Sequence, residues 1–142
     1  MPYELRDHTA DVAVAATGDT LDTLFAAVAD GLTAASSESI PEAGGERFSV
    51  EATAATREAV LFDYLDRLIY ERDVRHVLPA DHRCRVREPI ASDKAGAWTV
   101  EASARGVPLS AVDAREIKAV TYSEMSIEQQ KGGWEAYVVF DV

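Results

Sequence analysis

Two groups of oxygen-bearing residues are the best candidates for chemistry in this sequence. In the first, Asp7-His8-Thr9-Ala10-Asp11, the Asp11 carboxylate can serve as a ligand for a hard cation and His8 as a nearby donor. In the second, Asp141-Val142, a side-chain and a main-chain carboxylate concentrate negative charge that a divalent cation or a lysine would stabilise. Structural roles stay open for both groups, because Asp and Thr are common in turns and a terminal Asp is often simply solvated.

A hairpin signal connects the second group to a lysine. With Lys131-Gly132 as a two-residue turn, the register predicts that Asp141 lies opposite Tyr122 and that Val142 lies opposite Thr121. Lys118, one of only three lysines, would then emerge close to the last carboxylates. An ordinary cross-strand ion pair, worth about 0.2 to 1 kcal/mol, would also account for this placement.

A basic stripe is the third candidate. Arg83, Arg85 and Arg87 alternate with apolar residues, which predicts three arginines on one face of a strand. A neighbouring strand that carries Glu101 would pair with them across the ladder, and this structural role is favoured. Phosphate binding or docking of a partner is the alternative.

Composition limits the class of protein. The chain has 142 residues, of which 47% are hydrophobic and 27% charged, as in a globular protein of one domain spanning 1–142. No apolar run approaches the roughly 18 residues that span a bilayer, and the N-terminal residues do not resemble a secretory signal. We therefore expect a cytoplasmic protein without a membrane segment.

Charge and missing motifs exclude several functions. The net charge of -11 argues against direct binding of nucleic acid, and together with the few lysines it is typical of a halophilic, salt-adapted proteome. Cys84 is the only cysteine, so an internal disulfide is impossible and a zinc cluster is not expected. Nucleophile-elbow and phosphate-loop motifs are missing, so the sequence does not indicate an independent enzyme.

Periodicity predicts the elements that carry these residues. Apolar residues at helical spacing indicate one helix from Leu21 to about Ser36, capped by Asp19 or Thr20, and a second that follows Thr56. Alternation with period two indicates strands at 3–6, 12–16, 48–53, 83–87, 98–105, 118–127 and 134–142. Because no regular βαβ rhythm is present, we expect an α+β domain with a largely antiparallel or mixed sheet and two amphipathic helices packed on it.

Several segments, in order and over essentially the whole chain, resemble the archease family. They are Asp7-His8-Thr9-Ala10-Asp11-Val12, Gly18 with the helix that starts at Leu21, Leu65 to Tyr70, Glu116 to Tyr122, and Asp141-Val142. The sequence departs from the family's pattern at Ser123, where His is frequent, and at Arg105-Gly106-Val107, where a Gly-Glu pair is common. We assign no role to position 123.

The resemblance implies an activator and not an enzyme. Archeases are cofactors of the RtcB-type RNA ligase, which joins tRNA halves with GTP through a guanylylated histidine, and they promote guanylylation and multiple turnover. By this resemblance Asp11, Asp141 and Val142 would bind a divalent metal, Ca²⁺ in the family's usual description or Mg²⁺, and Lys118 would be functional nearby. His8, from the first candidate group, completes the expected site. The ligase would contact the RNA and this chain would contact the ligase.

Two other functions remain open. A small metal-dependent hydrolase would use Asp11 and His8 on a bound water and would turn over without a partner. A general chaperone-like binding module would rescue unrelated clients without depending on Lys118.

Overall fold

Two helices and seven strands make up the part of the chain that the computed structural model describes, which is residues 2–8, 11–90 and 96–142, without the side chains of 6–8. The helices are α1 (Leu21–Ser36) and α2 (Arg57–Arg75), and η1 (Leu109–Ala111) is a short 3-10 turn. The strands are β1 (Tyr3–His8), β2 (Asp11–Gly18), β3 (Arg47–Ala54), β4 (Val77–Arg87), β5 (Trp98–Pro108), β6 (Ala119–Gln130) and β7 (Gly133–Asp141).

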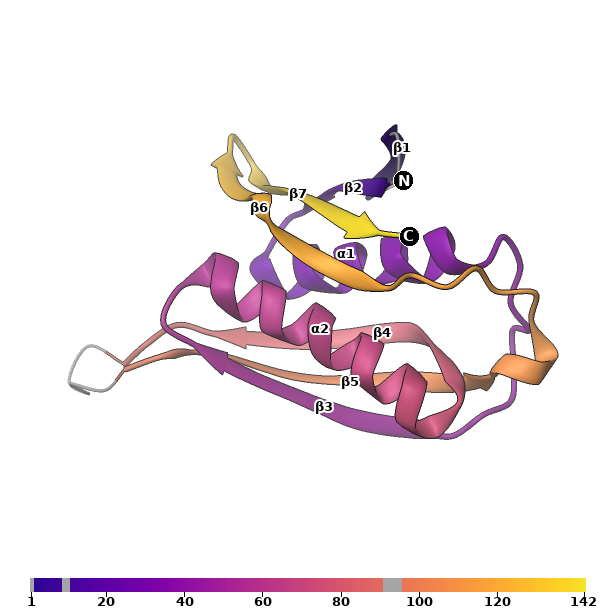
Figure 1. Cartoon of the computed structure of the whole chain (residues 1–142). Coiled ribbons are helices and arrows are strands. Elements are labelled where there is room, and N and C mark those ends of the chain that lie inside the picture. The colour runs from indigo at the N-terminus through magenta and orange to yellow at the C-terminus, as the bar shows by residue number, and fades with distance from the viewer. Residues whose placement is uncertain (1, 9–10, 91–95) are drawn as a thin grey trace.

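The strands form two antiparallel sheets with both helices between them (Figure 1). Sheet A has the order β1-β2-β7-β6, and sheet B has the order β3-β5-β4. The α+β class is confirmed, although the strands are divided between two sheets. Each helix therefore buries two faces, and Phe25, Tyr64 and Phe140 are among the largest side chains of the shared core.

Both helices begin where the sequence predicts. The Thr20 side chain accepts a hydrogen bond from the amide of Thr23 at the start of α1, and Thr56 accepts one from Ala59 at the start of α2. These bonds satisfy amides that have no partner within the helix. The α1 helix ends at Ser36, as expected. The α2 helix ends at Arg75 and is capped by His76, whose φ of 56° lies in the left-handed region.

Strand β4 is an edge strand whose free amides face α1. The amide of Val86 donates to Asp22 at 2.7 Å, and the amide of His82 makes a longer contact of 3.5 Å with Asp30. A bulge at residues 80–83 turns His82 into the protein, where its Nε2 lies 2.8 Å from the Thr33 hydroxyl. Carboxylates of the helix thus occupy an edge that could otherwise pair with another chain.

The β6–β7 hairpin corrects the predicted register. The Lys131-Gly132 turn is confirmed, since Gln130 pairs with Gly133. The ladder then shifts in β6 between Thr121 and Ser126, so Thr121 lies opposite Val139 and not opposite Val142. Asp141 accordingly lies opposite Ala119, and the prediction that it faces Tyr122 was wrong. The extra residues of β6 include Tyr122, whose ring makes an edge contact of 5.7 Å with Phe62 on α2.

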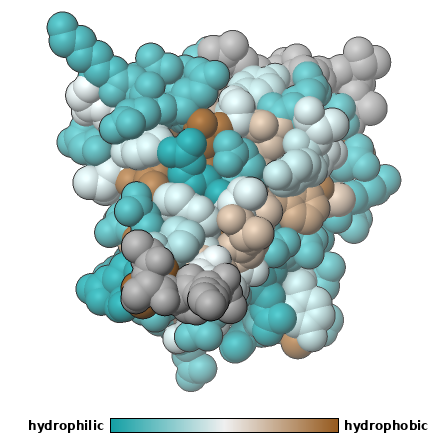
Figure 2. Space-filling model, turned by 90° about the vertical axis from the view of Figure 1, so that its left-hand side faces the viewer, coloured by the Kyte–Doolittle hydropathy of each residue, from teal (hydrophilic) through white to brown (hydrophobic). Residues whose placement is uncertain are grey.

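One side of the molecule is mainly hydrophilic (Figure 2). Figure 2 shows one side of the molecule, on which hydrophobic residues form small separate patches. No helix in the described ranges is long and apolar enough to cross a membrane.

Asp30 predicts an unusual pH dependence of stability. Burial raises its pKa from 3.8 to about 6, against the opposing effect of the His82 amide. The folded state therefore holds this proton more tightly than the unfolded chain, and the resulting stabilisation is present below about pH 4 and lost as the pH rises through about 6. Asp30→Asn keeps an oxygen for the His82 amide without the charge. It should be more stable than the parent at about pH 7.5 and similar to it at about pH 4.

Urea denaturation at these two pH values and constant KCl measures this difference. Asp66→Asn, at an exposed position of α2, is the control and should change little at either pH. The buried His82, whose pKa burial lowers to about 4, acts in the opposite direction, but it is present in every variant and cancels in the comparison. An Asp30→Asn protein less stable than the parent at neutral pH would contradict the assignment.

Candidate functional site

The register of sheet A brings residues from three strands to one end. Asp11 begins β2 and lies opposite Asp141 at the end of β7, and Asp141 lies opposite Ala119 at the start of β6. The amide of Lys118 donates to the main-chain oxygen of Asp141 at 2.8 Å. We call Asp11, Asp141 and Val142, with Lys118 beside them, the acidic end. Four of the five residues proposed from the sequence are thus brought together.

The acidic end sets two acidic residues directly opposite each other on neighbouring strands. Directly opposed residues of an antiparallel pair project from the same face with Cβ atoms about 4.5 to 5.5 Å apart, and like charges there are destabilising. Among the described side chains, none forms an ion pair with Asp11 or Asp141. A cation would relieve this repulsion, and a donor set made of oxygen atoms alone suits Ca²⁺ or Mg²⁺ better than zinc.

His8 is the fifth residue proposed from the sequence. Its backbone ends β1 directly opposite Asp11. Its side chain lies outside the described residues, so its expected part in the site stays a prediction.

The segment before Lys118 is held by contacts that the sequence analysis missed. Residues 112–118, here called the connector, form no helix or strand. The Arg115 amide donates to the carbonyl oxygen of Ser36 at 2.6 Å. The buried Arg72 donates through Nη1 to the carbonyl oxygen of Ile117, also at 2.6 Å. The helix dipole readily explains an arginine in the last turn of a helix. Arg72 lies on the buried side of α2, however, and this position was the one sequence signal that it contacts another segment.

The basic stripe has the structural partner that was favoured. Arg83, Arg85 and Arg87 are exposed on β4, and Arg85 lies opposite Glu101 on β5. The ion pair forms one step along the ladder, between Arg87 Nη2 and Glu101 Oε2, at 3.6 Å. Both side chains are more than half exposed, so this pair contributes little to stability.

Cys84 and His82 have the environments of unreactive side chains. The Cys84 thiol donates to the Tyr64 hydroxyl at 3.1 Å, and burial raises the pKa of the thiol to about 12. His82 is buried, its pKa is lowered to about 4, and its Nδ1 has no hydrogen-bond partner among the described residues. At neutral pH both side chains are uncharged, and His82 is buried and Cys84 partly buried, so neither resembles an activated nucleophile or an accessible base.

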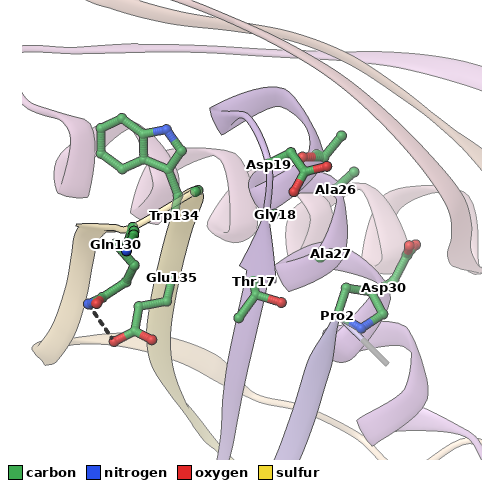
Figure 3. Close-up of a pocket in the computed structure, with 14 residues that line it drawn as sticks. Pro2, Thr17, Gly18, Asp19, Ala26, Ala27, Asp30, Gln130, Trp134 and Glu135 are labelled. Atoms are coloured by element: carbon green, nitrogen blue, oxygen red, sulfur yellow. Dashed lines mark hydrogen bonds between the residues drawn. The ribbon is translucent and has the colours of Figure 1, made fainter.

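A cavity of about 710 Å³ lies at the opposite end of sheet A (Figure 3). It is lined by the β6–β7 turn, the end of β2 and α1, with Asp19, Asp30 and Trp134 among its residues. Strand β7 runs from this cavity to Asp141 over nine residues, or about 30 Å. The cavity and the acidic end are therefore separate features.

Comparisons with known proteins agree over nearly the whole chain. The model of the Archease protein family matches residues 3–142. A protein archease from Methanosarcina mazei is 32% identical over 143 residues, which cover 99% of this chain and 95% of that protein. A protein archease from Methanopyrus kandleri is 29% identical and covers all of both chains.

Solved structures share the fold. The solution structure of Methanobacterium thermoautotrophicum protein 1598 superposes with a TM-score of 0.83 at 26% identity and covers 99% of each chain. The crystal structure of an archease from Thermotoga maritima, described as a possible chaperone, has a TM-score of 0.62 at 20% identity and covers 98% of this chain and 96% of that one. By the family model and these relatives, the chain belongs to the Archease protein family.

Proposed function

We propose that this protein is a non-enzymatic, cytoplasmic cofactor of an RtcB-type RNA ligase in tRNA splicing. It would promote the GTP-dependent guanylylation of the ligase and its multiple turnover, with the acidic end as the part that acts. Membership of the family supports a role of this kind. The single observation that carries the proposal is the pairing of Asp11 with Asp141, with Lys118 bonded to the backbone of Asp141.

The acidic end offers ligands for a divalent metal. Asp11 and Asp141 would each supply a carboxylate, and Val142 would add main-chain oxygen. Ca²⁺ accepts such an irregular set of oxygens, whereas Mg²⁺ would retain several waters in its octahedral shell. When bound, the metal would supply positive charge that organises phosphate oxygens.

The protein's own residues would act by position and charge. The acidic end lies where β2, β7 and β6 meet, so backbone hydrogen bonds fix the places from which Asp11 and Asp141 project. Lys118 is exposed beside these carboxylates and can approach an anionic group of a docked partner. Such an effect on the ligase would be one of positioning and electrostatics, because the attacking histidine belongs to the ligase.

Two alternatives make different predictions. A general chaperone, the role suggested for the Thermotoga maritima archease, would protect unrelated clients and would not need Lys118. A metal-dependent hydrolase would turn over alone. Cys84 and His82 are uncharged at neutral pH because burial raises the pKa of Cys84 and lowers that of His82. They therefore give the hydrolase no additional catalytic group.

Loss of either carboxylate should strongly reduce activation. Asp11→Asn and Asp141→Asn keep the size of each side chain and remove its charge, so the backbone pairing should survive while multiple-turnover ligation falls about tenfold or more. Lys118→Ala should have a comparable effect. The measurement is ligation of RNA ends by the cognate ligase in high KCl, with guanylylation followed in parallel.

Asp66→Asn provides the matched control, since Asp66 is exposed on α2. Full activation by Asp11→Asn or Asp141→Asn would refute the assignment to the acidic end. Protection of unrelated clients by all variants would favour the chaperone, and turnover without the ligase would favour the hydrolase.

Cation binding can be tested without the ligase. A Ca²⁺ ion bound between the opposed carboxylates would offset their repulsion and would bind only the folded protein. Ca²⁺ should therefore raise the thermal midpoint of the parent protein. At a Ca²⁺ concentration of about a hundred times the dissociation constant, the free energy of unfolding should rise by about 2.7 kcal/mol. Asp141→Asn should be more stable than the parent without Ca²⁺ and should respond much less to it. Calorimetry at constant KCl, with Mg²⁺ as a second cation, measures both effects. An equal Ca²⁺ shift in the parent and in the variant would place the binding site elsewhere.

A further inference from the structure

Arg72 carries a buried guanidinium whose N–H groups donate to two residues, Asp73 and Ile117. Only 10% of its side chain is exposed, and burying a guanidinium is costly unless its donors find acceptors. Its Nε and Nη2 both lie 3.0 Å from Oδ1 of the neighbouring Asp73, which is itself 64% exposed. Its Nη1 donates at 2.6 Å to the carbonyl oxygen of Ile117. Among the described residues, the contact with Ile117 is the one hydrogen bond of the Arg72 side chain to another segment of the chain.

This contact acts on the peptide unit that Ile117 shares with Lys118. The carbonyl of Ile117 and the amide of Lys118 belong to one rigid plane. Arg72 holds the carbonyl from α2, and the main-chain oxygen of Asp141 accepts from the amide at 2.8 Å on β7. The peptide is therefore fixed from both sides, between a helix and the strand that carries Asp141.

Of the side chains that the structure describes, no other donates a hydrogen bond to the connector as close to Lys118. Arg115 is bound to the end of α1, through its amide to Ser36 and through Nη2 to Ala35 at 3.2 Å, but it lies three residues earlier. The side chain of Ile117 is fully buried and anchors the connector without choosing the rotation of the following peptide. That rotation is set by the two hydrogen bonds.

We propose that Arg72 is a positioning residue that acts through the Ile117–Lys118 peptide and sets where Lys118 stands relative to Asp141. The geometric part of this inference is independent of any partner, and its consequence for activation rests on the proposed function. Arg72→Met removes the donor and keeps much of the apolar stem. Arg72→Lys keeps one charged donor that can reach the same carbonyl.

The first test measures the backbone without the ligase. Amide hydrogen exchange by NMR should show Lys118 exchanging about tenfold faster in Arg72→Met, with less change in Arg72→Lys, while Thr121 in β6 keeps its protection. Arg75→Met is the matched control. Arg75 lies on the same helix and contacts Glu71 and Phe48, so its loss should destabilise α2 without reaching the connector. Parent-like exchange of Lys118 in Arg72→Met would overturn the inference.

The second test measures activation at a temperature where all variants are folded. Arg72→Met should lower multiple-turnover ligation by about 10- to 100-fold, Arg72→Lys should restore part of it, and Arg75→Met should stay within about twofold of the parent. If Lys118→Ala lowers activation while Arg72→Met does not, the positioning role is wrong. If Lys118→Ala has no effect, Lys118 has no part in the proposed function. The hydrogen-exchange result then still tests whether Arg72 positions the Ile117–Lys118 peptide.

Discussion

The pairing of β7 with a strand on each side is the constraint on which the acidic end depends. Its ladder with β2 sets Asp141 against Asp11, and its ladder with β6 sets Asp141 against Ala119, directly after Lys118. A slip of one residue in either ladder would turn Asp141 to the other face of sheet A. Val138 and Phe140 of β7 lie in the shared core, and such a slip would turn both side chains out of it.

The helices fix the distance between the two sheets. Gly31 on α1 is an example, because a Cβ there would lie 2.5 Å from a methyl carbon of Val14 on β2. Tyr64 on α2 reaches toward sheet B, where its hydroxyl meets Cys84. Close packing on both faces explains how α1 and α2 hold together two sheets that, in the described ranges, share no hydrogen-bonded strand pair.

Local signals were sufficient for much of this arrangement. Thr20, Thr56 and the Lys131-Gly132 turn act on neighbours within a few residues, so capping and turn rules located them correctly. The turn predicted that Lys118 emerges close to the last carboxylates, but its hydrogen bond to Asp141 depends on the shift in β6. The shift in β6 did not follow from the turn, because it depends on contacts such as Tyr122 with Phe62, sixty residues apart in sequence. Alternation likewise reveals which face a strand buries but not its partners, so neither the division into two sheets nor the inward turn of His82 could be read from the sequence.

The order of strands in sheet A also has a consequence for synthesis of the protein. Strands β1 and β2 precede β7 in sequence by more than a hundred residues, yet β2 pairs with β7. Such distant pairings form late, since they must wait until the intervening chain has been made and folded. While β7 is still inside the ribosome, β2 has one side without a partner and Asp11 has no opposing carboxylate. The acidic end is therefore assembled only after translation has passed β7, and a chain that stops before β7 would carry Asp11 without its opposing carboxylate.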